Sequence, residues 1–417
     1  MTTQQDLPTT TEFAPADGPV RPGSPELAQL LAAIGDGAFE RERDEVAPHN
    51  AVDLVRQARL GALRVPTELG GAGATAREAF ETFIALGRVD PNVAHILRAH
   101  YWFVEARRAS PDLAEREHWL TEAARGSIFG NASTELGTEN TGAYQPTEFQ
   151  TVLSPDPERD GEFRLNGTKY YSTGSLYSDW VAVIASTPQS GIATAIVPAN
   201  RDGVQLLDDW DGIGQRLTGT GTSHFRDVVV HPHERVDDSA RAELPSYAAP
   251  WLQLYLTAII AGILESAASD AAELVRGRQR TYTHASADTP AADPLIQHVV
   301  GQLETNAFAA RSIVLAAADA LDAASDSVVD GAADTDLVRE ASLAAAKAKV
   351  AVDELAQRSG WLVFEAGGAS ATKQSYNLDR HWRNARTITS HNPSLYKTRA
   401  IGDLAINATP LPQTWFI

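Results

Sequence analysis

The spacing of apolar residues changes twice along the 417-residue chain and predicts three structural regions. From residue 25 to 125, apolar side chains recur three or four positions apart, as Leu27 and Leu30 illustrate, and this period predicts amphipathic helices. From residue 126 to 238, short β-branched or aromatic runs predict strands. Helical spacing returns between residues 239 and 417. The pattern predicts an α+β fold, mostly α, with a β domain between an N-terminal helical domain and a C-terminal helical bundle.

The β region contains short runs of strand composition at residues 148–153, 162–165, 169–171, 180–184, 193–197 and 224–230. Turn residues such as Asp, Pro, Gly and Asn separate these runs. Several short strands joined by turns are typical of a small antiparallel barrel or sandwich. Residues 1–24 are polar and contain Pro, and they bury too little apolar surface to offset the entropy of ordering. We therefore expect a flexible tail there.

Composition excludes several classes of protein. The net charge of -19 disfavours nucleic acid and anionic membranes as partners, because binding a polyanion requires clustered Lys and Arg. The absence of Cys excludes disulfides, thiolate catalysis and iron–sulfur clusters. The polar start is neither a signal peptide nor a membrane span. We therefore expect a cytoplasmic enzyme, and no metal site, because the His residues lack ligand spacing.

Basic side chains, an aromatic residue and two His gather between Arg380 and Lys397. Gly367-Gly368 ends the helical pattern before this segment, and Asn392-Pro393 ends the pattern within it. His391 is therefore predicted in an irregular turn that follows an Arg-rich helix.

This helix and turn resemble the C-terminal segment of acyl-CoA dehydrogenases, whose loop carries a catalytic Glu. Here the loop carries His391, and no carboxylate follows before Asp403. The run His391-Asn392-Pro393, with Tyr396-Lys397 after it, resembles instead the reduced-flavin monooxygenases of the dibenzothiophene monooxygenase type, which share that fold. The order of helices, strands and helices also matches, so the resemblance covers nearly all of the chain after residue 24.

The resemblance implies an acyl-CoA dehydrogenase-like fold and a two-component flavin monooxygenase. A separate flavin reductase would supply reduced FMN, O2 would form a C4a-hydroperoxyflavin, and one oxygen atom would pass to a small organic substrate that is aromatic, a thioether or an amine. Reduced FAD stays an alternative cofactor. The resemblance also implies a homotetramer, and the Ala-rich segment from Ala341 to Ala356 offers a face for it.

Two segments resemble the family's contacts to the flavin ring. In Phe129 to Glu135, the resemblance implies Asn131 and Ser133 as cofactor contacts, although a polar β-turn has the same composition. In Ser172-Thr173-Gly174, it implies Ser172 as a cofactor contact and Thr173 as the hydroxyl that faces flavin N5. The resemblance also implies Lys397 as a cofactor contact. A Thr in a strand is more often structural, so the prediction for Thr173 depends on the whole pattern Ser172-Thr173-Gly174 rather than on the Thr alone.

For proton transfer, the resemblance implies His391 as the acid/base, because a His with a near-neutral pKa both gives and takes a proton. His95 and His100 repeat the family's His spacing in the N-terminal region, and five residues on a helix turn the two side chains apart, so only one is expected to face the pocket. Either residue also fits a core position. Three aromatic residues are candidates to line a substrate cavity or to pack in a core: Tyr101, Trp102 and Trp210.

The flavin phosphate needs a basic partner, and Arg276, Arg278 and Arg280 form a basic run where a helix is expected to end. The resemblance implies Arg280 as the phosphate ligand, often across a subunit boundary, although a solvated face explains the same run. Relatives also use an Arg in the loop after Gly368, where this chain has Ser370. The residues that bind the phosphate end of the flavin therefore stay open.

Two other functions compete with oxygenation. An acyl-CoA dehydrogenase or flavin oxidase needs a carboxylate base, but residues 244–264 contain no Asp or Glu, and Glu265 comes too far along to match. A non-catalytic flavin-binding scaffold would take up no oxygen in response to substrate. The sequence identifies neither the substrate nor whether sulfur, nitrogen or carbon is oxygenated.

Overall fold

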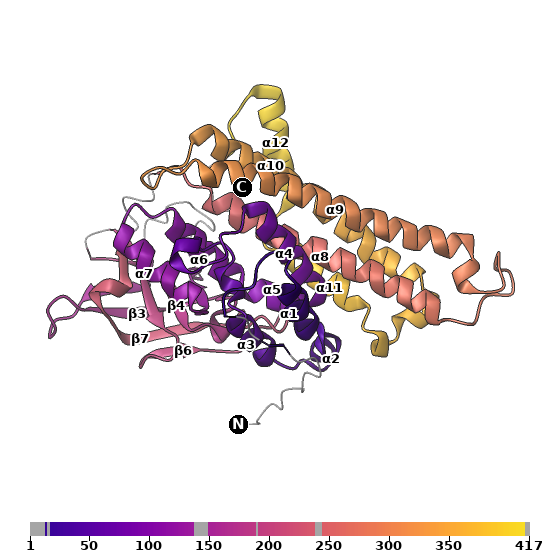
Figure 1. Cartoon of the computed structure of the whole chain (residues 1–417), viewed down its shortest axis with the longest axis horizontal. Helices are drawn as coiled ribbons and strands as arrows, with labels where there is room; N and C mark the ends of the chain where they lie inside the picture. The colour runs from indigo at the N-terminus through magenta and orange to yellow at the C-terminus, as the bar shows by residue number, and fades with distance from the viewer. Residues whose placement is uncertain (1–12, 15–16, 137–148, 189–190, 238–243, 413–417) are drawn as a thin grey trace.

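The computed structural model describes residues 13–14, 17–136, 149–188, 191–237 and 244–412. Helices occupy both ends of the chain and strands lie between them, so the predicted α+β fold, mostly α, is confirmed (Figure 1). Part of the predicted tail (residues 1–12 and 15–16), the segment 137–148 and the predicted strand start at residue 148 lie outside the described residues.

The N-terminal region consists of helices that the apolar period predicts: α1 (Pro25–Gly35), α2 (Ala38–Asp44), α3 (His49–Gln57), α4 (Ala76–Val89), α5 (Pro91–Ile96), α6 (Arg98–Arg108) and α7 (Leu113–Ala124). Ser24 caps α1, and Asp90 caps α5 through two backbone N–H groups. The prediction that the tail reaches residue 24 is wrong at Val20. Its side chain is buried and its N–H donates to Ala58 O (3.0 Å), because even one apolar residue gains by covering α3.

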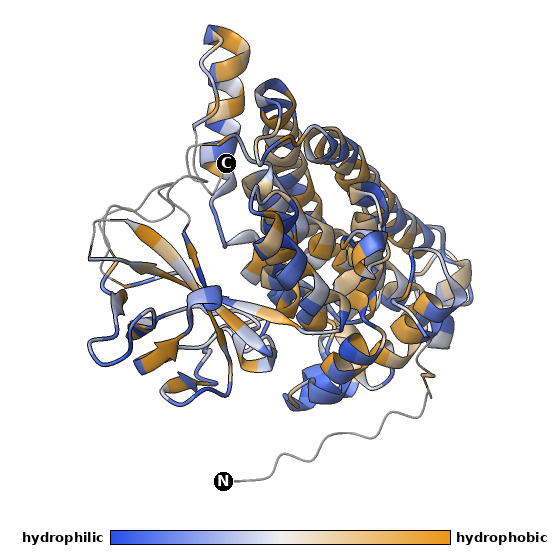
Figure 2. Cartoon of the chain, turned by 60° about the vertical axis from the view of Figure 1, so that its left-hand side comes forward, coloured by the Kyte–Doolittle hydropathy of each residue, from blue (hydrophilic) through white to orange (hydrophobic). Residues whose placement is uncertain are grey.

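Strands of the middle region form one curled sheet, seen on the left of Figure 2. They are β1 (Phe129–Ala132), β2 (Val152–Pro155), β3 (Phe163–Lys169), β4 (Trp180–Ser186), β5 (Ile192–Pro198), β6 (Val204–Leu206), β7 (Ser223–Val230) and β8 (Arg235–Asp237). Within the described part of the chain, the order is β6-β7-β3-β2-β4-β5-β8, and β1 pairs with β4.

The expected antiparallel sheet is wrong at its centre. Strand β4 runs parallel to β1 and, at one residue pair, parallel to β2. Long stretches of chain separate these strands, which parallel pairing requires. Strand β3 contains most of the predicted run at 162–165 but ends at Lys169, so the run predicted at 169–171 is wrong beyond its first residue. Strands β6 and β8 were not predicted, because three residues are too few to show a period.

The C-terminal bundle contains α8 (Ala248–Gly277), α9 (Pro294–Asp326), α10 (Thr335–Glu365), α11 (Asp379–Thr389) and α12 (Ser394–Asn407). Helix α4 packs closely on α8, where a Cβ on Gly262 would lie 2.4 Å from Ile84 O. Helix α8 is long and apolar enough to span a membrane, but 78% of its most apolar window is buried, as expected of the central helix of a bundle.

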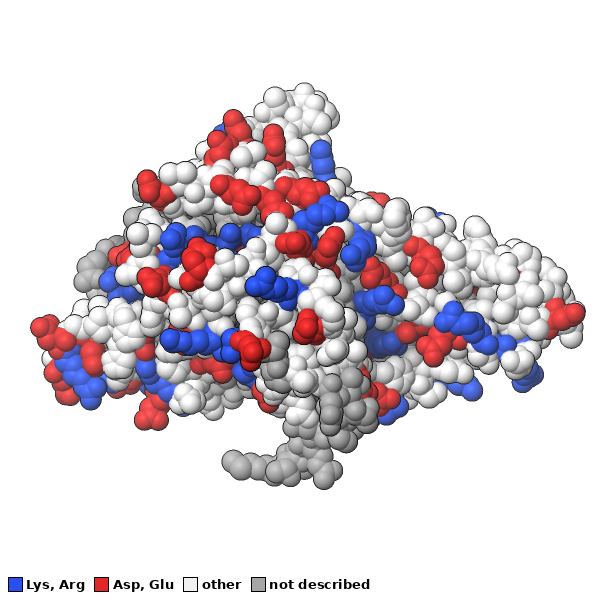
Figure 3. Space-filling model, in the orientation of Figure 1, with Lys and Arg blue, Asp and Glu red and all other residues white. Residues whose placement is uncertain are grey.

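The Ala-rich face of α10 serves this bundle. Ala341, Ala345 and Ala348 are buried within the chain, and α10 packs on both α8 and α9. The expectation that this face is free for a subunit contact is therefore wrong, because small side chains let the helices of one chain approach closely. On the face seen in Figure 3, acidic and basic side chains are interspersed rather than gathered into a basic stripe.

A candidate active site between the sheet and the bundle

The four residues predicted to contact the flavin ring meet at one edge of the sheet. The end of β1 and the turn after β3 are joined by a bridge between Thr134 and Tyr170. The Asn131 amide lies 3.5 Å from the Ser133 hydroxyl, and Asn131 O accepts a hydrogen bond from Ser175 Oγ (2.9 Å). Ser172 Oγ is a buried atom with no hydrogen-bond partner among the described residues. This edge therefore holds a polar atom for which the described residues supply no partner.

The Thr173 hydroxyl belongs to a row of hydroxyls that leads to His95. Thr220 Oγ1 donates to Thr173 Oγ1 (3.0 Å), and the hydroxyls of Thr220 and Thr218 are 2.6 Å apart. Thr218 Oγ1 in turn donates to the backbone oxygen of Gln215 (2.8 Å). The Gln215 carboxamide oxygen lies 2.9 Å from His95 Nδ1. Residues 215–220 therefore connect two predicted site residues that lie far apart in the sequence.

The contact with Gln215 determines which nitrogen of His95 carries the proton. Because the carboxamide oxygen only accepts, His95 Nδ1 donates and Nε2 keeps a lone pair. His95 Nε2 is buried and has no partner among the described residues. Burial, and then the charge of Arg98, lower the pKa of His95 to about 3. His95 is therefore a neutral acceptor at neutral pH, and the expected near-neutral pKa is wrong for it.

A buried polar network holds the 215–220 segment in place. Glu42 accepts hydrogen bonds from Asn92 (2.6 Å) and Asn384 (3.3 Å). These two amides then accept the N–H groups of Leu217 (3.3 Å) and Gln215 (2.6 Å). Burial raises the pKa of Glu42. Helices α2, α5 and α11 thus fix the backbone that orients His95.

His391 lies in a turn between α11 and α12, as predicted. Both sides of this turn are anchored. Lys349 Nζ donates to Thr389 O (3.3 Å), and Ser394 Oγ donates to Asp353. Beside His391, the Asn392 amide donates to Gln253 of α8, so α10 and α8 together hold the turn against the bundle.

The charges around His391 are positive. Desolvation, and then repulsion from Arg98, His95, Lys349 and Lys397, lower the pKa of His391 well below its ordinary value. The residue keeps an exposed surface, so solvent or a ligand reaches it. His391 is therefore neutral at neutral pH, contrary to the expected near-neutral pKa, and it lies in a positive field.

Lys397, the predicted cofactor contact, lies deep in the same region. Its side chain is buried, and burial, followed by the charge of Lys349, lowers its pKa to about 7. Lys349 pairs with Asp353 (2.7 Å), so one carboxylate faces two lysines here.

His100 is a core residue. Its Nε2 lies 2.9 Å from Gly61 O, and its Nδ1 accepts the N–H of Phe129 (3.3 Å), so the backbone occupies both nitrogens. The prediction of His100 as a pocket donor is therefore not supported. Tyr101 is also buried, with its hydroxyl donating to Leu60 O (2.6 Å). Trp210, by contrast, reaches the site region, because its indole N–H donates to Gln215 O (3.0 Å).

The predicted phosphate contacts lie at the other end of the bundle. Arg280 is exposed beyond the last turn of α8. Arg278 of the same segment donates to Ala366 O (2.9 Å), which brings the run beside the loop that carries Ser370. Helix α8 has 30 residues and is therefore roughly 45 Å long. Its first turns contact the His391 loop through Gln253, whereas Arg280 follows its last turn, so Arg280 and His391 of one chain lie far apart.

Sequence reasoning missed Gln215, Thr218, Thr220 and Arg98. The alternation Thr218-Gly219-Thr220-Gly221-Thr222 is an unusual pattern that indicates a series of hydroxyls on a tightly placed backbone. A Cβ on Gly221 would lie 1.8 Å from Leu207 O, which explains why this segment requires Gly. The importance of Arg98 has no comparable signature, because it depends on the residues around it.

This arrangement agrees with what the chain resembles. Family models of the acyl-CoA dehydrogenase middle domain and C-terminal domain match residues 134–228 and 254–393. The chain therefore has the acyl-CoA dehydrogenase fold.

Relatives define the family more narrowly. The probable FMNH2-dependent monooxygenase SfnC of Pseudomonas putida is 29% identical over 401 residues, covering 94% of this chain and 97% of SfnC. Dibenzothiophene monooxygenase of Rhodococcus erythropolis is 30% identical, covering 90% of this chain and 91% of that enzyme. The chain belongs to this family of FMNH2-dependent monooxygenases.

Solved structures agree. FMN-bound TdsC from Paenibacillus sp. A11-2 superposes with a TM-score of 0.82 at 26% identity, covering 93% of this chain and 98% of TdsC. Methanesulfinate monooxygenase MsuC from Pseudomonas fluorescens superposes with a TM-score of 0.82 at 28% identity, covering 94% of this chain and 98% of MsuC. The predicted family and FMN as its cofactor are therefore confirmed.

Proposed function

We propose that this protein uses reduced FMN from a separate flavin reductase, together with O2, to add one oxygen atom to a small organosulfur compound. The observation that carries the proposal is the junction of sheet and bundle, where neutral His95 and exposed His391 share a positive field beside the Thr173 hydroxyl row. The catalytic turn carries no carboxylate, which disfavours removal of an α proton as in a dehydrogenase. We also propose that the protein acts in the cytoplasm, where a flavin reductase supplies the reduced flavin.

The residues at the sheet edge fit a flat, polar cofactor ring. Ser172 Oγ and His95 Nε2 are buried without partners among the described residues, and such atoms are costly unless a ligand completes them. Asn131 and Ser133 offer further polar groups beside them. When bound there, reduced FMN supplies the electrons that activate O2.

Each site residue has a role that follows from its contacts. Thr173 accepts from Thr220 and keeps its own proton to donate to the cofactor. His95 presents a neutral acceptor, held in place by Gln215. His391 is neutral and exposed, so it accepts a proton from, or hydrogen-bonds to, the group that reacts.

The phosphate end of FMN requires a second copy of the chain. Arg280 and the loop around Ser370 lie roughly a helix length from His391 of the same chain, so they serve the site only if another subunit brings them there. Exposed apolar residues support an assembly. Leu395 and Ile406 of α12 are both 82% exposed, and α12 stands out from the body of the chain (Figure 1). We propose a homotetramer, with Arg280 of one subunit binding the phosphate in another.

The direct test mixes the protein with FMNH2 without oxygen and then adds oxygen with a panel of organosulfur compounds. We expect product that contains one atom from 18O2, and purified protein that binds FMNH2 more tightly than oxidised FMN. Oxygen consumption that yields only H2O2 with every compound would contradict a monooxygenase. Reduction of bound FMN by an acyl thioester would favour the dehydrogenase alternative.

Light scattering tests the tetramer. Replacing reduced FMN by reduced FAD tests which flavin the protein uses.

A further inference from the structure

Arg98 is a half-buried cation for which the described residues supply no carboxylate partner. It begins α6, three residues after His95, and its Nε lies 3.5 Å from Leu252 O, a weak contact. No ion pair joins it to a carboxylate among the described residues. Burial lowers the pKa of Arg98 to about 10, so the guanidinium still carries its charge at neutral pH.

The position of Arg98 connects it to the catalytic turn. Its contact, Leu252, precedes Gln253, which accepts from Asn392 beside His391. The charge of Arg98 acts on both His95 and His391. Lys349 and Lys397 add further positive charge, and Asp353, their carboxylate neighbour, already pairs with Lys349. This cluster is conspicuous in a chain with a net charge of -19.

A charge that is partly buried without a partner is costly, and a ligand of opposite charge reduces that cost. A guanidinium presents paired N–H groups that match the oxygens of a carboxylate, sulfinate or sulfonate. We propose that Arg98 forms a subsite for the negatively charged group of the substrate, which makes a small organosulfur anion the preferred substrate class. The inference rests on the proposed oxygenation and specifies its substrate.

Methanesulfinate is the simplest probe of this class. Oxygenation adds one oxygen atom of O2 to its sulfur and gives methanesulfonate. The sulfur provides two electrons, and FMNH2 provides two electrons and two protons, so the second oxygen atom leaves as water. Dimethyl sulfone matches the probe in size and in its S=O groups but carries no charge, so it serves as the neutral comparison.

The test measures binding first, by titrating the full-length protein with methanesulfinate and with dimethyl sulfone. Arg98→Met keeps much of the side-chain volume and removes the charge, Arg98→Lys keeps the charge, and Arg226→Ala removes an exposed Arg of β7 as a control. We expect Arg98→Met to weaken methanesulfinate binding roughly 10- to 100-fold, the range for a charged hydrogen bond. Arg98→Lys should retain part of the affinity, and binding of the sulfone should not change.

Two results would overturn the subsite. One is equal binding of methanesulfinate by wild type and Arg98→Met, including no binding by either. The other is weaker binding of FMNH2 by Arg98→Met with unchanged methanesulfinate binding, which would assign the charge to the reduced flavin. Turnover separates this inference from the proposed function. If 18O enters neutral sulfur compounds equally well in wild type and Arg98→Met, only the subsite fails, whereas no 18O product from any compound contradicts the monooxygenase itself.

Discussion

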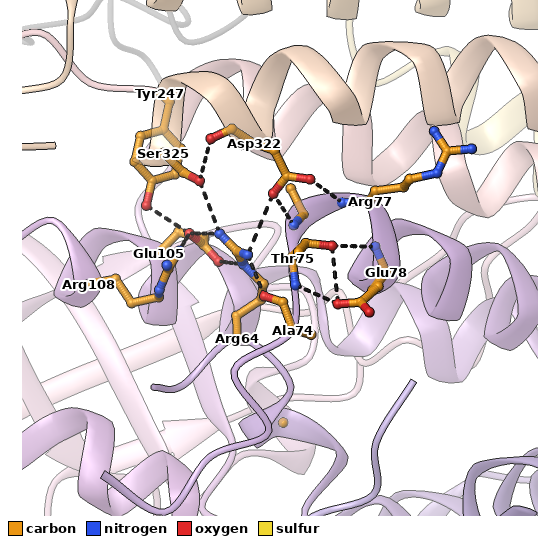
Figure 4. A network of polar contacts seen from close by, with 12 residues as sticks. Arg64, Ala74, Thr75, Arg77, Glu78, Glu105, Arg108, Tyr247, Asp322 and Ser325 are labelled. Atoms are coloured by element: carbon orange, nitrogen blue, oxygen red, sulfur yellow. Dashed lines mark hydrogen bonds and ion pairs between the residues drawn. The ribbon is translucent and has the colours of Figure 1, made fainter. Parts of the chain in front are cut away.

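Arg98 and Glu105 occupy the same face of α6, two turns apart, and both lie against the start of α8, yet their surroundings differ. The Glu105 carboxylate accepts hydrogen bonds from Arg64 (2.7 and 3.4 Å), Arg108 (2.6 Å) and the Tyr247 hydroxyl (2.8 Å) (Figure 4). Arg98 has one long contact to a backbone oxygen. Within the part of the chain that the structure describes, the charge of Glu105 is compensated by two arginines, and the charge of Arg98 has no carboxylate partner.

This difference separates structural from functional polar groups. Although burial opposes ionisation, Arg108, Arg64 and Tyr247 hold the pKa of Glu105 below its ordinary value. Its network joins α6 to α8 and α9, because Arg64 also contacts Ser325 (3.3 Å). Ser172 and His95, near the other end of this region, keep polar atoms without partners among the described residues. Buried groups that are satisfied stabilise the fold, and those left unsatisfied await a ligand.

The largest expected effect comes from the turn that carries His391. His391→Phe should slow oxygen transfer roughly 10²–10⁴-fold, the usual range for loss of an acid–base group, while the free energy of unfolding stays nearly unchanged. Single-turnover product formation and urea unfolding measure the two quantities. His298→Phe, at an exposed position of α9, is the matched control and should change neither. If His391→Phe forms product as fast as the wild type, the turn has only a structural role.

Glu105→Gln should lower the free energy of unfolding and leave the rate of oxygen transfer unchanged, the opposite of His391→Phe. It leaves Arg64 buried and Arg108 partly buried without the Glu105 carboxylate, and loss of one partner of a buried ion pair costs about 3–5 kcal/mol. Urea unfolding measures this loss, and the folded fraction should keep its turnover rate. Arg98→Met provides the comparison on the same helix, with little loss of stability expected. If the two variants destabilise the protein equally, the distinction between the two regions fails.

The sequence predicted what depends on local pattern. The period of apolar residues and the break at Gly367-Gly368 predicted the helices, and Asn392-Pro393 predicted the turn of His391. The parallel pairing of β4 with β1 was missed, because register between distant strands leaves no local pattern. The separation of Arg280 from His391 was likewise invisible, since it depends on the direction and length of α8.

The candidate site was predictable only where a motif carried it. His95 and His100 looked alike in the sequence, and the difference arises because the backbone at Gly61 and Phe129 occupies both nitrogens of His100. Arg98 was missed for a related reason. A lone Arg on a helix is ordinary, and only the surrounding structure reveals that no carboxylate of the described residues pairs with it.

Lys397 allows the comparison to be tested by pH. The folded protein releases this proton above about pH 7, whereas the unfolded chain holds it up to about pH 10.5. The unfolded state therefore binds more protons between these values, and stability should rise with pH by up to about 1.4 kcal/mol per unit. Below pH 7 both states are protonated and this contribution to the slope vanishes. Lys397→Met should lack this slope in urea unfolding from pH 6 to 9, and parallel curves would refute the low pKa.

The smallest expected effect concerns Thr173. Its hydroxyl accepts from Thr220, and because a hydroxyl carries one proton, that proton stays available for a ligand. Thr173→Ala removes this donor without touching His391. Loss of one hydrogen bond of about 0.5–1.5 kcal/mol should lower the product formed per FMNH2 oxidised roughly two- to twelve-fold, with the difference released as H2O2. Thr173→Ser keeps the donor and should restore coupling. If Thr173→Ser leaks as much H2O2 as Thr173→Ala, the methyl group matters rather than the hydroxyl, and Thr173 belongs with Glu105 among the structural residues.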